Sequence, residues 1–310
     1  MFRNISILVL VFVIGFPLFA GEAAANSPTD LIVFDRTNNT FMRRAADGKV
    51  SVINIARSKG EIVSLCADHD GDGKTDIGYW SISDRTWTIV RSSDGQTLNI
   101  AIDTARFAAN AIPVIGNFDG DRRADIGFFV AKTGTWFFIN SLDGYDGTTP
   151  STLSFGKAGD IPVAADYDGD GTTDAAVFRP STDEWIYRSS ATGETIAEKF
   201  VAGEKDILVP ADYDGDGKAD LAIYGDSTWT FRRSSGAGIE KLVFGFADAM
   251  PTPTDIDGDG VTDPSFYRNG VWYFYDSSTP RLHTLAFGTS RSIPLTMIAA
   301  TEKSSARIKR

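Results

Sequence analysis

Five short segments of the chain each place three or four aspartates within nine residues, with glycines between them. They are ADHDGDGKTDIGYW (67–80), GNFDGDRRADIGFF (116–129), ADYDGDGTTDAAVF (165–178), ADYDGDGKADLAIY (211–224) and TDIDGDGVTDPSFY (254–267). Carboxylates this close repel one another and raise each other's pKa, so the crowding makes sense if a cation sits among them. The common pattern D-x-D-G-D-G-x-x-D supplies only oxygen ligands, and its glycines permit a tight backbone. Calcium suits such a set best, because it accepts six to eight oxygens in flexible geometry whereas magnesium keeps its waters.

The candidate calcium ligands are the side chains at loop positions one, three, five and nine and the backbone carbonyl at position seven. They are Asp68, Asp70, Asp72, Lys74 and Asp76; Asn117, Asp119, Asp121, Arg123 and Asp125; Asp166, Asp168, Asp170, Thr172 and Asp174; Asp212, Asp214, Asp216, Lys218 and Asp220; and Asp255, Asp257, Asp259, Val261 and Asp263. We expect four strong sites and a weaker fifth at 117–125, where Asn117 replaces an acid and Arg122 replaces a glycine. An EF-hand is excluded, because position twelve carries no glutamate and strands flank the loops. The alternative is that these segments are solvated turns without metal.

The acidic loops recur at a spacing of about 43 to 49 residues, which is in the range of propeller blades. Tryptophans keep register with the loops at positions 87, 136, 185, 229 and 272, and Phe41 holds the corresponding place after Asp30. The start of the chain beyond its leader is therefore part of a sixth repeat. The tryptophans either pack between blades or stack on a sugar ligand, and burial is the usual state of a large aromatic.

Each repeat predicts four short strands, for example 161–165, 175–179, 184–188 and 195–200, separated by turn residues. No stretch has the period of an amphipathic helix. The segment 292–300 aligns with the first strand of a repeat, so it can complete the unit that begins at Asp30. We predict an all-β fold, a six-bladed β-propeller with four-stranded blades, whose last blade is closed by N- and C-terminal strands.

The N-terminal segment 1–25 has a basic start, an apolar run and small residues, which is typical of a secretory signal peptide. We expect residues 26–300 to form one propeller domain, secreted or periplasmic in a bacterium, monomeric, and without a membrane span after cleavage. The lone Cys66 allows no internal disulfide, so a metal is the available staple. A net charge of −11 argues against a nucleic-acid partner.

The chain resembles the FG-GAP/VCBS repeat proteins, whose blades are similar to those of the integrin α-chain propeller. The resemblance covers almost all of 30–300 and rests on the acidic loops, on Phe-Gly steps at 155–156, 244–245 and 287–288, and on Ile-Pro steps at 112–113, 161–162 and 293–294. It implies calcium at the acids of positions one, three, five and nine. The sixth site should be empty, because its aligned residues are Ile298, Ala300, Glu302 and Asp30.

Three functions remain open at this stage. The first is a non-catalytic binding or adhesion module for carbohydrate or an extracellular protein, as the resemblance implies. The second is a polysaccharide lyase or hydrolase, although His69 lies inside a metal loop, His283 falls in an expected outer strand, and Cys66 is expected in a strand as a buried apolar group. The third is surface assembly through the basic tail 301–310, which otherwise is a solvated end.

Overall fold

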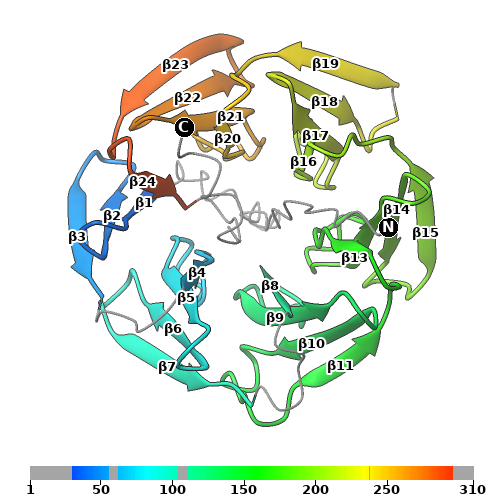
Figure 1. The fold of residues 1–310 in the computed structure, drawn as a ribbon, viewed down its shortest axis with the longest axis horizontal. Coiled ribbons are helices and arrows are strands. Elements are labelled where there is room, and N and C mark those ends of the chain that lie inside the picture. Colours follow the sequence, from blue (N-terminus) through cyan, green and yellow to red (C-terminus); the bar gives the residue numbers. More distant parts are fainter. Residues whose placement is uncertain (1–29, 56–61, 104–110, 237, 296–310) are drawn as a thin grey trace, which may run out of the picture.

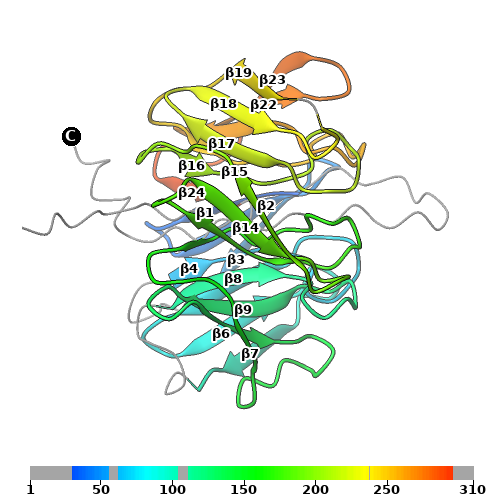
Figure 2. The ribbon, with the colours of Figure 1, turned by 90° about the vertical axis from the view of Figure 1, so that its right-hand side faces the viewer.

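The computed structural model describes residues 30–55, 62–103, 111–236 and 238–295. Within these ranges the chain forms six antiparallel sheets of four strands each and no helix. The sheets stand around a common axis as the blades of a propeller (Figure 1), and a side view shows the resulting disc (Figure 2). The predicted all-β, six-bladed architecture is confirmed.

We name the blades A to F in chain order and give their strands from the axis outward. Blade A contains β24 (Ser292–Pro294), β1 (Leu31–Asp35), β2 (Thr40–Arg44) and β3 (Val50–Asn54); blade B contains β4 (Ile62–Ser64), β5 (Ile77–Ser81), β6 (Thr86–Val90) and β7 (Thr97–Ala101). Blade C contains β8 (Ile112–Gly116), β9 (Asp125–Val130), β10 (Thr135–Ile139) and β11 (Ser151–Ser154); blade D contains β12 (Ile161–Pro162), β13 (Ala175–Arg179), β14 (Glu184–Arg188) and β15 (Thr195–Lys199). Blade E contains β16 (Ile207–Leu208), β17 (Leu221–Gly225), β18 (Thr228–Arg232) and β19 (Ile239–Val243); blade F contains β20 (Met250–Pro251), β21 (Ser265–Arg268), β22 (Val271–Asp276) and β23 (Arg281–Ala286).

Blade A is built from both ends of the described chain. The strand β24 pairs antiparallel with β1, so that Val33 faces Pro294 and Asp35 faces Ser292. One further backbone hydrogen bond extends the pairing, from the amide of Leu295 to the carbonyl of Ile32. The ring is therefore closed as the sequence predicted, and β1 is not left as an open edge.

Burial decreases from the second strand of a blade to its outer strand. Every residue of β1 and of β9 is buried, because both faces of these strands pack against neighbouring blades. The outer strands β3 and β7 are mostly exposed. This gradient explains why the second strands read as continuous apolar runs, whereas the outer strands carry polar residues.

The repeated tryptophans belong to the core. Trp87, Trp136, Trp185, Trp229 and Trp272 are all fully buried, and Phe41 is buried in the same place in blade A. They cannot stack on a sugar, so the packing interpretation of the tryptophan row holds.

The Phe-Gly steps are explained by these tryptophans. The indole N–H groups of Trp136, Trp229 and Trp272 donate to the carbonyls of Phe155, Phe244 and Phe287 at 2.8, 3.0 and 3.0 Å. The glycines that follow, at 156, 245 and 288, have φ of 114, 144 and 106°, a region that L side chains rarely adopt. Blade D has Val201 after Phe200 instead, and its Trp185 donates to the Tyr167 hydroxyl at 2.7 Å.

Two expectations about local structure need correction. The first strand of blade D ends at Pro162 and resumes only as a bridge between Ala165 and Asp174, because the backbone turns away to enter the acidic loop. Cys66 is buried as expected, but it lies beyond the end of β4 rather than within a strand.

The signal segment 1–25, residues 298, 300 and 302 of the sixth site, and the tail 301–310 lie outside the described residues. Among those described, no helix has the length and apolar character needed to cross a membrane.

We predict that Phe41→Ala lowers the free energy of unfolding by about 3–5 kcal/mol, because it leaves a cavity in the blade that closes the ring. Denaturant unfolding of the purified protein measures this change. Val52→Ala is the matched control, since Val52 lies in the same blade with 57% of its surface exposed. Equal effects of the two substitutions would contradict the assigned role of Phe41.

Candidate metal centres

Each acidic loop connects the first and second strands of its blade at the inner part of the ring. Isolated bridges close four of the loops at their base, between Ala67 and Asp76, Ala165 and Asp174, Ala211 and Asp220, and Thr254 and Asp263. In blade C the corresponding pair, Gly116 and Asp125, belongs to the β8–β9 ladder. Each loop is thus the connection of a β-hairpin whose base is closed by strand pairing, which fixes its position in the fold.

The first aspartate of a loop folds the backbone around its own carboxylate. Asp68 accepts hydrogen bonds from the amides of Gly71 at 2.7 Å and Gly73 at 2.8 Å. The same two bonds recur at Asp166, Asp212 and Asp255. Gly71 and Gly73 have φ of 81 and 78°, which explains why the motif requires glycine at positions four and six.

The last aspartate of each loop is fully buried and joins three segments of the blade. One oxygen of Asp76 accepts from the amide of His69 at 2.9 Å, and the other accepts from the amide of Ser92 at 2.6 Å. Equivalent pairs of bonds form at Asp125, Asp174, Asp220 and Asp263. This residue therefore fixes the loop to the turn that follows the third strand.

Serines in that turn contact the loop carboxylates, and the sequence interpretation missed them. The Ser92 hydroxyl donates to Asp72 at 3.2 Å, and the Ser93 hydroxyl lies within 2.5 Å of Asp70. Matching contacts are made by Ser141 to Asp121, Ser190 to Asp170, Ser234 to Asp216, Ser235 to Asp214 and Ser278 to Asp257. A signal existed, because a serine stands five residues after every repeat tryptophan.

Four loops gather three carboxylates so closely that one oxygen from each lies within 4.8 Å of the other two. The groups are Asp68, Asp70 and Asp76; Asp166, Asp168 and Asp174; Asp212, Asp214 and Asp220; and Asp255, Asp257 and Asp259. Asp72, Asp170, Asp216 and Asp263 adjoin these groups without belonging to them. At position seven, the backbone amides of Lys74, Thr172, Lys218 and Val261 donate to the aspartate at position five.

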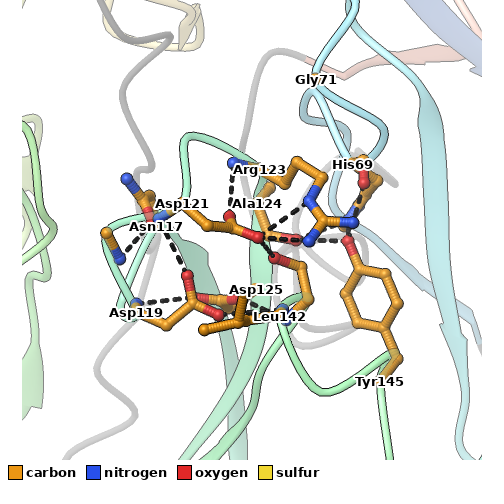
Figure 3. A network of polar contacts seen from close by, with 12 residues as sticks. His69, Gly71, Asn117, Asp119, Asp121, Arg123, Ala124, Asp125, Leu142 and Tyr145 are labelled. Atoms are coloured by element: carbon orange, nitrogen blue, oxygen red, sulfur yellow. Dashed lines mark hydrogen bonds and ion pairs between the residues drawn. The ribbon is translucent and has the colours of Figure 1, made fainter.

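The 117–125 loop of blade C forms no such group among the described residues. The Arg123 side chain pairs with Asp121, with its Nε at 2.8 Å from the carboxylate (Figure 3). The amide group of Asn117 donates to the Gly171 carbonyl in the next blade at 3.0 Å. A guanidinium therefore already neutralises one acid of this loop.

Blade A also holds a guanidinium against its single aligned acid. Asp30 accepts from the Nε of Arg43 at 2.7 Å and from the amide of Ala46 at 3.1 Å. The side chains of Arg43 and Asp30 are 14% and 9% exposed, so the pair is largely shielded from solvent. The sequence predicts no metal in this blade, and here the charge of Asp30 is balanced by Arg43 instead.

The loop carboxylates carry an electrostatic cost. Burial raises the pKa of Asp166 and of Asp125 to about 7, and that of Asp76, Asp174, Asp220 and Asp263 to about 6. Burial also raises the pKa of Asp68, Asp212 and Asp255. Although burial acts the same way on Asp121, hydrogen bonds from Arg123 and Ser141 hold its pKa below the usual value.

Neighbouring loops are connected by backbone hydrogen bonds. The amide of Ala124 donates to the Asp68 carbonyl across the boundary of blades B and C at 2.7 Å. Thr173 to Asn117, Ala219 to Asp166 and Thr262 to Asp212 repeat this bond at the next three boundaries, each at 2.7 Å. At the first boundary the Tyr145 hydroxyl also lies 2.9 Å from the His69 carbonyl and 2.8 Å from the Ala124 carbonyl (Figure 3).

The donor set of the four groups fits a hard divalent cation. It contains only carboxylate oxygens, and the acid at position nine of each loop is fully buried. Glycine and serine donors already orient the carboxylates, so a cation would replace mutual repulsion without rearranging the loops. These groups satisfy the chemistry of calcium better than that of a transition metal, which prefers nitrogen or sulfur ligands.

The groups that could support nucleophilic catalysis are placed unfavourably. Cys66 is fully buried, and burial raises its pKa to about 12, so it forms no thiolate near neutral pH. Burial lowers the pKa of His69 to about 4, and its Nδ1 faces the Ala124 carbonyl. His283 in β23 lies 3.5 Å from Asp276, but the nearby Ser278 donates to that carboxylate rather than to the imidazole.

Comparison with known proteins identifies the architecture. No family model and no curated protein matches the chain. Among solved structures, a lectin of Agrocybe aegerita described as recognising non-reducing terminal N-acetylglucosamine aligns over 87% of this chain and 76% of its own, with 18% identity and a TM-score of 0.59.

Two further structures are similar to the chain at lower identity. A structure of the nidogen/laminin complex aligns with 9% identity over 86% of this chain and 96% of its own, at a TM-score of 0.55. A catalytically inactive virginiamycin B lyase of Staphylococcus aureus, solved with quinupristin, aligns with 9% identity over 89% and 95%, at a TM-score of 0.52. At these identities the likeness shows the propeller fold alone.

We predict that the stability of the metal-free Asp166→Asn variant, measured relative to metal-free wild type, is greater at pH 8 than at pH 4. Because the folded-state pKa of about 7 lies above the ordinary 3.8, the protonated acid is favoured in the fold. Its contribution is fully present below pH 4 and is lost as the pH rises through 7, whereas asparagine does not titrate. Melting temperatures of metal-stripped wild type and variant, measured from pH 4 to 8, should therefore diverge in favour of the variant.

The control for this series is Asp183→Asn, which changes a half-buried turn aspartate of the same blade outside the acidic loop. A difference in melting temperature between Asp166→Asn and wild type that stays constant with pH would show that burial does not raise the pKa of Asp166.

Proposed function

We propose that this protein is an exported, calcium-stabilised β-propeller that acts as a non-catalytic binding module. The observation that carries the calcium part is the recurrence of one arrangement in four blades: three carboxylate oxygens within 4.8 Å, oriented by glycine amides and by serines of a second segment. A single cluster of this kind could be a solvated turn. Four such clusters at the same place in their repeats, with buried acids of raised pKa, are expected each to bind the same kind of ion.

Calcium acts structurally in this proposal. Bound to the carboxylates, it would supply positive charge and several oxygen coordination positions, removing the cost of burying the acids. The ion would also hold the loop against the turn after the third strand, because both segments contact the same carboxylates. Extracellular calcium modules have dissociation constants of about 10⁻⁴–10⁻³ M, so the sites would stay loaded outside the cell.

Membership of the FG-GAP/VCBS repeat proteins and export by the 1–25 segment complete this proposal. The support for the family is the acidic loops and the Phe-Gly steps, whose phenylalanine carbonyls receive the tryptophan N–H groups. The support for export is the sequence of the leader and the use of oxygen-ligand sites in a chain with one cysteine. The protein would act in the periplasm or outside the cell as a monomer.

Carbohydrate or an extracellular protein is the proposed ligand class. Support comes from the fold shared with the N-acetylglucosamine-recognising lectin and with a component of the nidogen/laminin complex. The buried state of Cys66 and the contacts of both histidines favour binding over nucleophilic catalysis. The polysaccharide-degrading alternative would have to use other groups.

We predict that calcium raises the melting temperature of the metal-stripped protein and that Asp168→Asn removes one ion and part of that rise. Each site loaded at a hundredfold excess over its dissociation constant contributes about 2.7 kcal/mol. Isothermal titration and thermal melts measure both effects, with Asp183→Asn as the control outside the loop. Because protons compete for these acids, calcium affinity should increase from pH 5 to 7. Identical melts in chelator and in calcium would exclude the structural role.

We predict that the calcium-loaded chain binds glycans or extracellular proteins without turning them over. A glycan array that includes terminal N-acetylglucosamine probes the first class, and immobilised matrix proteins probe the second. The viscosity of polysaccharide solutions incubated with the protein should remain constant. A fall in viscosity would instead support the polysaccharide-degrading function, and metal-stripped protein serves as the control for loop order.

A further inference from the structure

Arginines contact loop acids in three of the six blades, and these blades alternate around the ring. Arg43 pairs with Asp30 in blade A, Arg123 with Asp121 in blade C (Figure 3), and Arg233 with Asp220 in blade E. In blades B, D and F, none of the arginines or lysines in the described ranges makes an ion pair with a loop acid.

The Arg233 contact lies directly on a candidate metal group. Its Nη1 is 3.1 Å from Asp220 Oδ2, and Asp220 forms one group with Asp212 and Asp214. The side chain is held in place, because the guanidinium lies 4.6 Å from the centre of the Phe231 ring and its Nε lies 3.3 Å from Glu240. Only 17% of the arginine side chain is exposed, so water screens its charge weakly.

Blade B shows why an arginine at this place need not reach the loop. Arg91 stands four residues after Trp87, just as Arg233 stands four residues after Trp229. Arg91 is drawn instead to Asp94 in its own turn, with Nε 3.2 Å from that carboxylate. Blade E has Gly236 at the position of Asp94, so no acid of the turn diverts Arg233.

We propose that the blades alternate between two kinds of counter-ion. Blades A, C and E hold a guanidinium against their acids, whereas blades B, D and F bind calcium tightly. Blade E keeps three clustered carboxylates and takes calcium only weakly, because Arg233 competes for Asp220. This proposal rests on the calcium binding proposed above and assigns its order of filling to named arginines.

The test compares calcium titrations of metal-stripped wild type, Arg233→Gln and Arg232→Gln. Wild type should bind three ions tightly and a fourth at least about tenfold more weakly, a difference of about 1.4 kcal/mol. In Arg233→Gln the fourth ion should join the tight class. Arg232→Gln removes the same charge from a neighbour that pairs with Glu198 in blade D, and it should leave the titration unchanged.

A second variant tests the opposite direction in blade B. Asp94→Asn retains the turn but releases Arg91, which should then approach Asp76 and weaken that site, leaving two tight ions. This variant keeps the proposal testable if Arg233→Gln fails to fold. Anomalous scattering from wild-type crystals equilibrated with limiting calcium gives an independent reading, since blades B, D and F should fill before blade E.

The outcomes separate this proposal from the one on which it rests. Four equal tight sites in wild type, unaffected by Arg233→Gln, would overturn the alternation while leaving calcium binding intact. Equal occupancy of blades B, D, E and F in the crystals would overturn it as well. Absence of calcium binding in wild type and variants alike would overturn both proposals.

Discussion

The loops of this propeller depend on a fully buried aspartate at the end of each acidic motif. Asp76 and its equivalents accept one hydrogen bond from their own loop and one from the turn after the third strand. The same carboxylate thereby sets the hairpin base, the loop and the distant turn. Burial makes that carboxylate costly to ionise, which raises its pKa to about 6 in Asp76. The fold is organised around charges that it does not fully neutralise by itself.

The chain balances these charges in more than one way. Glycine amides donate to the first aspartate of four loops, and serine hydroxyls donate to acids of all five described loops. These neutral dipoles offset only part of the repulsion between ionised carboxylates. Arginine supplies a full charge in some blades. In the others, the carboxylate groups remain without an ion pair in the part of the chain that the structure describes. The propeller is thus a repeat in backbone geometry but not in electrostatics.

The fold was predictable from sequence because its determinants recur with every blade. The tryptophan register, the acidic motif and the split first repeat together specify six blades and their closure. The motif likewise identified the acids that cluster, such as Asp166, Asp168 and Asp174. The serines were visible as a recurring residue, but their role depends on a contact between segments about 20 residues apart, which local pattern does not reveal.

The ion-pair partner of each arginine could not be predicted from its position in the repeat. Arg91 and Arg233 occupy the same place in their repeats, yet one turns to Asp94 and the other to Asp220. The outcome depends on whether a competing acid stands three residues later. Asn117 is similar, because its Nδ2 donates to a carbonyl of the next blade while its Oδ1 accepts from Gly120 in its own loop.

The closing pair of strands has a mechanical consequence. The C-terminal end of β24, at Pro294, faces Val33 near the start of β1. The two ends of the described chain therefore leave blade A on the same side. Force applied through both ends would peel β24 from β1 one residue pair at a time, rather than shear all pairs together. The backbone bonds that connect the loops of blades B to F would bear none of that initial load. A molecule tethered at both ends would therefore open at blade A, while one tethered at a single end would keep its ring unloaded.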